Sequence, residues 1–433
     1  MVAGIVGREL CGVMRWGRRA VCASVAAVGV ALGLPAGASA SAASLALTPY
    51  MGWNPYFANL GSANEATFES VASSLMSTGL EQAGYRIFWL DYGWASGARD
   101  PTTHQLIVNS AQWPTGMKGF TDWLHQHGFL AGIYTDAGKS GCNGRGVGSY
   151  GYYQEDANTF AAWGFDAVKV DFCGAGKTWL DQYPYDPPTL YTQFSQALAR
   201  NSSGRPMILN VCNFWTPGQI NGTAPPYADS SWDNFSWAPA VAQSWRTDTD
   251  IGFPNNVVFA NVLRNLDQDS TPQAEVQAAG PGHWNDPDYL APGLGMTGVQ
   301  AQSQFSMWAM VAAPLMLGSD PRALTSSTIT MLENAGVIAI DQDSLGAQGY
   351  LLSQSGSAQV WVKPLANGDR AVALFNRGSG TLQIATTARA AGLPRARHYT
   401  LLNLWTNTTT KTTGNISASV QPDTVALYRV TAG

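Results

Sequence analysis

Charged side chains are scarce in this 433-residue sequence: they make up 12% of it, and the formal net charge is −5. No cluster of lysine and arginine follows the N-terminal segment, which argues against a nucleic-acid partner. The 5 histidines are scattered and no Cys-x-x-Cys pair occurs, so the sequence indicates neither a metal site nor a cofactor. Beyond the N-terminal segment no apolar run approaches the roughly 18 residues that cross a bilayer, so we expect no membrane span in the mature protein.

The first forty residues have the order of a signal peptide. Arginines, ending with Arg18 and Arg19, precede an apolar stretch over residues 20–34, and the small residues Ala38, Ser39 and Ala40 follow. This order of charge, apolar core and cleavage site predicts a signal peptide over residues 1–40 and a secreted, extracellular mature protein.

Export leaves three cysteines in the mature chain, Cys142, Cys173 and Cys212. In an oxidising compartment three cysteines favour one disulfide and one free thiol. The spacing alone leaves the choice of pair open.

Aromatic residues are plentiful where charges are few, with 16 tryptophans, many of them beside Asp or Asn. Flat apolar faces with polar edges suit stacking against sugar rings better than they suit phosphate binding. Core packing is the alternative for most of these tryptophans.

Short apolar runs that end in polar or aromatic clusters alternate with amphipathic stretches between residues 44 and 339, the predicted catalytic domain. The runs end near Trp53, Tyr92, Asp136, Asp171, Cys212, Asp250, Asp288 and Ser319. Eight such units predict an α/β fold, a (β/α)8 TIM barrel, in which the carboxyl ends of all strands meet on one face. Over residues 342–433 the pattern becomes short alternating strands with turns such as Asn367-Gly368-Asp369, which predicts a C-terminal antiparallel β-sandwich.

The fourth strand carries the candidate nucleophile. Lys169 and Asp171 lie two residues apart and therefore share one face of the strand. A neighbouring cation lowers the pKa of a carboxyl group, and an ionised carboxylate can act as a covalent nucleophile. A buried structural ion pair is the alternative for an isolated Lys-x-Asp.

Together with this strand, four further segments carry a family resemblance. They are Thr48–Trp53, Gly132–Asp136, Gly148–Tyr153 and Gly280–Asp288. From Thr48 onward the chain resembles glycoside hydrolase family 27, the α-galactosidase family. The resemblance implies a retaining glycosidase that cleaves terminal α-galactosides through a covalent glycosyl-enzyme intermediate.

The resemblance also implies residue roles. Asp171 would be the nucleophile, and Asp250, four residues after Arg246, would be the acid/base in preference to Asp248. The residues implied to line the sugar site are Trp53, Asp91, Tyr134, Lys169, Arg246 and Asp288. A disulfide between Cys142 and Cys173 is implied as well, which would leave Cys212 free.

Two positions depart from the family pattern. Tyr92 stands where a second aspartate usually holds sugar hydroxyls, and Asn213 stands where a glutamate usually helps to bind the 2-hydroxyl. Both changes remove a charge from hydroxyl recognition, so an α-glucan-active, isomaltodextranase-like enzyme and a β-L-arabinopyranosidase are alternatives. From another class, the alternative is a non-catalytic carbohydrate-binding protein.

Overall fold

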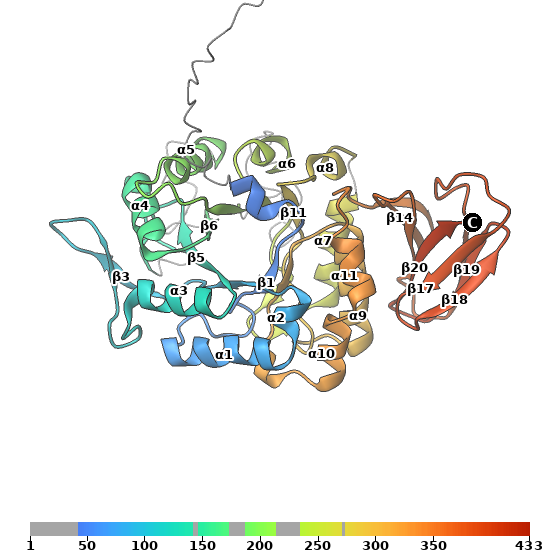
Figure 1. Cartoon of the computed structure of the whole chain (residues 1–433), viewed down its shortest axis with the longest axis horizontal. Helices are drawn as coiled ribbons and strands as arrows, with labels where there is room; N and C mark the ends of the chain where they lie inside the picture. Colours follow the sequence, from blue (N-terminus) through green and yellow to red (C-terminus); the bar gives the residue numbers. More distant parts are fainter. Residues whose placement is uncertain (1–41, 142–145, 173–186, 214–233, 271–272) are drawn as a thin grey trace, which may run out of the picture. The chain divides into compact units, whose positions relative to one another are not determined.

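The computed structural model describes residues 42–141, 146–172, 187–213, 234–270 and 273–433 (Figure 1). Eight parallel strands form a curled sheet in the order β11-β8-β7-β6-β5-β2-β1-β12. Their bounds are β1 Met51–Trp53, β2 Ile87–Trp89, β5 Leu130–Asp136, β6 Ala167–Asp171, β7 Ile208–Cys212, β8 Ser244–Arg246, β11 Trp284–Asp286 and β12 Leu315–Leu317. A parallel bridge between Leu290, just after β11, and Leu317 of β12 brings the two ends of the sheet together. The predicted TIM barrel is confirmed, with each of the eight predicted runs providing one strand.

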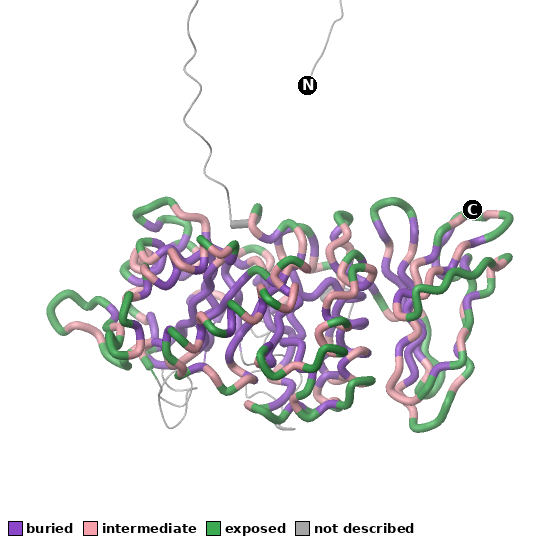
Figure 2. The backbone as a smooth tube through the Cα atoms, turned by 60° about the horizontal axis from the view of Figure 1, so that its bottom comes forward, coloured by how far each residue is buried: buried purple, intermediate pink, exposed green. Residues whose placement is uncertain are grey.

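Helices cover the outside of the barrel sheet. They are α1 Glu65–Ser77, α2 Leu80–Ala83, α3 Gly116–Gln126, α4 Tyr153–Trp163, α5 Pro187–Ala199, α6 Asn234–Trp237, α7 Phe259–Ser270, α8 Gln273–Ala278, α9 Gly298–Met310, α10 Ser326–Leu332 and α11 Ala335–Asp341. The start of α1 shows how the sequence sets such an end, because the side chain of Asn64 accepts a hydrogen bond from the backbone N–H of Thr67. Figure 2 shows buried backbone at the centre of this part of the chain, with partly buried and exposed segments around it.

Two hairpins extend the loops that follow barrel strands. β3 (Ala95–Arg99) and β4 (Leu106–Val108) form the first, which projects from the barrel in Figure 1. β9 (Gly252–Phe253) and β10 (Asn256–Val257) form the second, immediately after the candidate acid/base Asp250. Both hairpins lie in loops at the carboxyl ends of strands, where substrate-binding residues of this fold are found.

The C-terminal strands form antiparallel sheets, which confirms the predicted sandwich. The six-stranded sheet has the order β13-β14-β15-β20-β17-β18, and β16 pairs with β19. The bounds are β13 Tyr350–Ser355, β14 Ala358–Pro364, β15 Arg370–Asn376, β16 Leu382–Thr387, β17 Tyr399–Asn403, β18 Thr408–Thr412, β19 Asn415–Val420 and β20 Thr424–Ala432. A separate cluster of buried apolar residues, with Val362, Leu374 and Ile416 at its centre, forms the core between the two sheets.

Helix α9 carries polar contacts to the sandwich. The indole of Trp405 donates to Ser306 Oγ at 3.0 Å, and the buried ammonium of Lys363 donates to the carbonyl oxygen of Ala309 at 2.9 Å. In the parts of the chain that the structure describes, no helix is long and apolar enough to cross a bilayer.

Candidate active site

The carboxyl ends of neighbouring barrel strands bring the predicted site residues together. In the pairing of β5 with β6, Tyr134 lies opposite Lys169, and in the pairing of β6 with β7, Asp171 lies opposite Cys212. At the β11 end of the same sheet, Asp286 of β11 lies opposite Arg246 of β8. Parallel register therefore places side chains from distant parts of the sequence at one end of the barrel.

Asp171 is a buried carboxylate held by a phenol. Its side chain is 8% exposed, and the hydroxyl of Tyr134 donates to Asp171 Oδ2 at 2.6 Å. Burial raises the pKa of Asp171 above its usual range, although the positive charge of Lys169 acts in the opposite direction. The expectation that Lys169 would leave this carboxyl with a lowered pKa is therefore wrong, because desolvation outweighs the cation.

The ammonium of Lys169 forms its ion pair with Asp91. Lys169 Nζ lies 3.0 Å from Asp91 Oδ2, which also accepts from Asn54 Nδ2 at 2.9 Å. Burial acts to lower the pKa of Lys169, but the charge of Asp91 and other acidic groups raises it well above the usual range. Lys169 is therefore a fixed cation at the centre of the site, and Asp91 is held by it.

Three tyrosine rings surround the Lys169 ammonium. The distances from Nζ to the ring centroids are 5.7 Å for Tyr56, 5.6 Å for Tyr134 and 5.4 Å for Tyr289. These distances lie in the range of cation–π attraction. Tyr56 and Tyr289 were not predicted, although each closely follows a predicted strand end, and that position was the available signal.

At the end of β8, Arg246 bridges two carboxylates. Arg246 Nη2 lies 2.8 Å from Asp288 Oδ2 and 3.1 Å from Asp250 Oδ1. Burial raises the pKa of Asp288 to about 7, against the lowering effect of Arg246. Asp250 is the more accessible carboxylate, with 29% of its side chain exposed against 0% for Asp288.

Asp288 has a left-handed backbone, with φ of 91°, which is unusual for a residue with a β-carbon. Its N–H donates to Asp286 Oδ1 at 2.9 Å, and Asp286 Oδ2 in turn accepts from Asn210 Nδ2 at 3.0 Å. In this conformation the Asp288 carboxylate accepts the N–H of Ile251 at 2.9 Å. The Asp286 carboxylate thus holds the backbone of Asp288. The Asp288 carboxylate in turn binds both Arg246 and the backbone N–H of the residue that follows Asp250.

The other aspartate considered for the acid/base role, Asp248, forms its ion pair with a different arginine from that of Asp250. Its carboxylate lies 3.2 Å from Arg264 Nε on α7, and it is 5% exposed. Asp250 pairs with Arg246 and belongs to the group around Asp288, whereas Asp248 pairs with a helix on the outside of the barrel.

Trp53 requires a correction, because its side chain lies in the wall of the barrel. It is fully buried, its indole donates to the carbonyl oxygen of Ser319 at 2.9 Å, and its ring packs against Phe68 and Phe88. Strand alternation points Trp53 toward the helices. Tyr56, three residues later, provides the aromatic side chain beside Lys169 instead.

The two positions that depart from the family pattern lie at the ends of their strands. The Tyr92 ring is partly buried and lies 6.0 Å from the ring of Tyr56. Asn213 is fully buried, and its amide donates to Asn234 Oδ1 at 2.9 Å. Its own Oδ1 has no hydrogen-bond partner in the part of the chain that the structure describes, so it retains a free acceptor.

The predicted disulfide partners Cys142 and Cys173 lie outside the described residues. Cys212 is a free, buried thiol next to Asp171 in the sheet. Burial, followed by the charge of Asp171, raises the pKa of Cys212 well above its usual range, so the thiol stays protonated.

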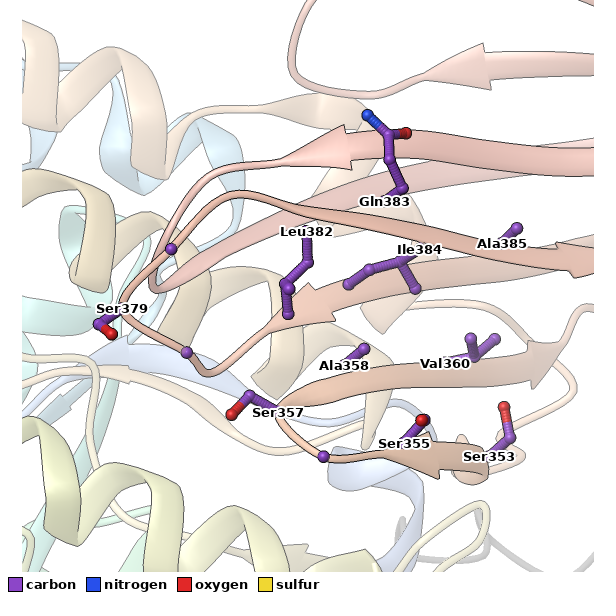
Figure 3. A pocket seen from close by; sticks show the side chains of 13 residues that line it. Ser353, Ser355, Ser357, Ala358, Val360, Ser379, Leu382, Gln383, Ile384 and Ala385 are labelled. Atoms are coloured by element: carbon purple, nitrogen blue, oxygen red, sulfur yellow. The ribbon is translucent and has the colours of Figure 1, made fainter.

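A cavity of roughly 600 Å³ lies in the sandwich, between the β13–β14 hairpin and β16. Serines such as Ser353, Ser355 and Ser357 line it together with Leu382 and Ile384 (Figure 3). No carboxylate lines this cavity, so it cannot supply acid–base chemistry. The acidic group at the end of the barrel is therefore the candidate active site.

Comparison with known proteins identifies relatives over most of the chain. Residues 58–343 match the model of the alpha galactosidase A family, and residues 355–430 match that of the alpha galactosidase C-terminal beta sandwich domain. An alpha-galactosidase of Cyamopsis tetragonoloba is 34% identical over 391 residues, which cover 89% of this chain and 87% of the relative. Alpha-galactosidase A of Cellvibrio japonicus is 35% identical over 347 residues, 78% of each chain.

The solved structures that superpose on this chain include two glycosidases. Alpha-galactosidase I from Mortierella vinacea superposes with a TM-score of 0.77 at 26% identity, covering 90% of this chain and 98% of the other. A β-L-arabinopyranosidase from Geobacillus stearothermophilus gives 0.74 at 20% identity over 92% of this chain and 100% of the other, and shares the fold.

Proposed function

Because the chain belongs to the α-galactosidase family, glycoside hydrolase family 27, we propose that this glycoside hydrolase removes terminal α-galactose from oligosaccharides or polysaccharides with retention of configuration. The observation that carries the proposal is the pair of carboxylates at the ends of β6 and β8. Asp171 is buried against Tyr134, and Asp250 is partly exposed beside Arg246. A retaining glycosidase needs a nucleophile and an acid/base in two such environments.

In the proposed first step, Asp250 gives its proton to the glycosidic oxygen while a carboxylate oxygen of Asp171 attacks the anomeric carbon. The bond from this carbon to the leaving oxygen breaks, the aglycone departs as an alcohol, and a glycosyl ester forms on Asp171. In the second step Asp250 removes a proton from water, and the water oxygen displaces Asp171. Two inversions give net retention, and this route calls for carboxyl groups about 5–5.5 Å apart.

The surrounding residues have binding roles in this proposal. Lys169 and Asp91 present a fixed donor and an acceptor for sugar hydroxyls, and Arg246 and Asp288 do so on the opposite side. Asn213 is fully buried and contributes to this end of the site through the hydrogen bond of its amide to Asn234. A relative from Saccharomyces cerevisiae, 26% identical, has been solved with raffinose, which supports an oligosaccharide substrate.

Azide rescue tests the two catalytic roles directly. We expect Asp171→Ala and Asp250→Ala each to lose roughly a thousandfold or more in kcat. With azide and an activated aryl α-galactoside, Asp171→Ala should form the β-galactosyl azide, whereas Asp250→Ala should form the α-galactosyl azide. Asp248→Ala is the matched control and should retain turnover. Exchange of the two azide products, or comparable loss in the control, would refute the assignment.

Tyr92, which departs from the family pattern, is the reason to test other sugars as substrates. Its position offers a ring where the family usually has a carboxylate, so hydroxyl selection at this end of the site differs. A panel of p-nitrophenyl α-galactoside, α-glucoside and β-L-arabinopyranoside, with dextran beside them, identifies the sugar. Activity on none of them, together with sugar binding, would favour a carbohydrate-binding protein.

Export of the mature chain is also part of the proposal. It rests on the arginines, apolar stretch and small-residue run of residues 1–40. N-terminal sequencing of protein recovered from the culture medium should find a start close to Ser41.

A further inference from the structure

The exposure of the carboxylates indicates where the leaving group lies in the site. The side chains of Lys169, Asp91 and Asp288 are 7%, 2% and 0% exposed, whereas that of Asp250 is 29% exposed. An acid/base residue must contact the glycosidic oxygen, so the part of the substrate beyond this oxygen lies next to Asp250. The site is therefore open where the leaving group has to be.

The hairpin formed by β9 and β10 follows Asp250 directly and is fixed by backbone hydrogen bonds. The N–H of Ile251 donates to Asp288 Oδ2 at 2.9 Å, and the N–H of Asn255 donates to the carbonyl oxygen of Phe57 at 2.8 Å. At the far end, the N–H of Val257 donates to the carbonyl oxygen of Leu294 at 2.7 Å. Bonds to the loops after β1 and β11 thus hold the hairpin at the edge of the site.

Glycine at position 252 permits the tight pairing of this hairpin. A β-carbon there would lie 2.3 Å from the carbonyl oxygen of Asn256 on the opposite strand. Asn255, at the turn, has a left-handed backbone with φ of 60°, which asparagine tolerates. The hairpin is therefore a short, close-packed element rather than an open loop.

This hairpin presents Phe253 to solvent. Phe253 is 71% exposed, more than any other large apolar side chain in the described part of the chain. Three residues of extended chain span at most about 10–11 Å, so its Cα lies within that distance of the Cα of Asp250. The backbone that carries this solvated ring therefore stays close to the candidate acid/base.

We propose that Phe253 is the binding platform for the leaving-group sugar, the pyranose ring that follows the bond to be cleaved. The ring of Phe253 offers a flat apolar surface to the C–H face of such a pyranose, and contact removes apolar surface of both from water. A small alkyl leaving group is too short to cover the ring. This assignment rests on the proposed role of Asp250, because that role locates the leaving group.

The test compares two substrates that differ only beyond the glycosidic oxygen. These are methyl α-galactoside and a disaccharide of α-galactose linked to O6 of glucose. From the apolar surface that contact would bury, we expect Phe253→Ala to lower kcat/KM for the disaccharide roughly tenfold. The value for methyl α-galactoside should stay unchanged, and Phe253→Tyr, which keeps the ring, should retain wild-type values for both substrates.

Val299→Ala is the matched control, because Val299 is an apolar side chain, 49% exposed, on α9. It should change neither substrate. An equal loss on both substrates in Phe253→Ala would overturn the platform, since the residue would then act through Asp250. No change on either substrate would overturn it as well. The azide products of Asp250→Ala report separately on the acid/base role, so failure of the proposed function and failure of this inference are distinguishable.

Discussion

The hydrogen bond from Tyr134 to Asp171 offers a direct way to change the ionisation of the proposed nucleophile. Both side chains are buried, 6% and 8% exposed, and the O···O distance is 2.6 Å. Burial, followed by the charge of Asp171, raises the pKa of Tyr134 well above its usual range, so the phenol stays protonated and donates. Tyr134→Phe removes this donor and leaves the ring over Lys169.

The size of the effect follows from the strength of this hydrogen bond. A hydrogen bond to a charged group contributes about 1.5–3 kcal/mol, and 1.36 kcal/mol corresponds to one pKa unit. The bond stabilises the ionised carboxylate, so its loss adds to the upward effect that burial already has on the pKa of Asp171. A nucleophile must be ionised, so the acidic limb of the pH profile of kcat/KM should move upward by about one to two pH units.

The assay is the pH profile of kcat/KM with p-nitrophenyl α-galactoside, in which the acidic limb reports on the free enzyme. Tyr191→Phe is the matched control. Its hydroxyl is equally buried but donates to the carbonyl oxygen of Val170 at 2.9 Å, so its loss should leave the limb in place. A uniform fall in kcat/KM with an unmoved limb in Tyr134→Phe would refute the reasoning, because Tyr134 would then act on the substrate alone.

Three further predictions concern separate parts of the site. Asp286→Ala should lower kcat about tenfold or more, because it removes the acceptor that holds the strained backbone of Asp288. Asp286→Asn keeps an acceptor and should retain most of the activity. Equal loss in both variants would exclude this positioning role. Tyr92→Asp should raise the ratio of α-galactoside to α-glucoside hydrolysis, and an unchanged ratio in the folded variant would mean that Tyr92 does not select the hydroxyl. Peptide mapping without reduction should link Cys142 to Cys173, and any link to Cys212 would contradict that pairing.

Much of the barrel could be predicted because each strand ends in a change of residue type. Apolar residues fill the strands, and polar or aromatic residues follow them, so the eight strand ends were visible along the sequence. The hairpin after Asp250 was not predicted. Its strands are two residues long, too short for a periodic pattern, and backbone contacts to other loops hold them in place.

The partner of Lys169 could not be read from local spacing. Lys169 and Asp171 share a face of β6, which favours a pair between them. In the folded barrel a long lysine side chain reaches Asp91, which follows β2, two strands away in the sheet. The order of strands in the sheet brings these groups together, and local spacing does not contain it, so the local pattern favoured the wrong partner.

Trp53 was wrongly expected to line the sugar site for a related reason. Trp53 belongs to a recognisable motif, yet it is the last residue of β1 and faces the helices, where it meets Phe88 of the adjacent strand. Tyr56 lies beyond the strand, where alternation no longer determines direction. Its ring is placed by the loop, in which the N–H of Tyr56 donates to the side chain of Asn54 at 2.9 Å.

Lys169 forms its ion pair with Asp91, yet its charge also acts on the proposed nucleophile. Burial raises the pKa of Asp171, whereas the charge of Lys169 and the hydrogen bond from Tyr134 both act to lower it. The Tyr134 hydroxyl therefore helps to keep Asp171 ionised. Lys169, held by Asp91 and surrounded by tyrosine rings, remains available with its other N–H groups for the sugar. One buried cation thus has two roles in the site: it holds Asp91 by contact, and its charge favours the ionised form of Asp171.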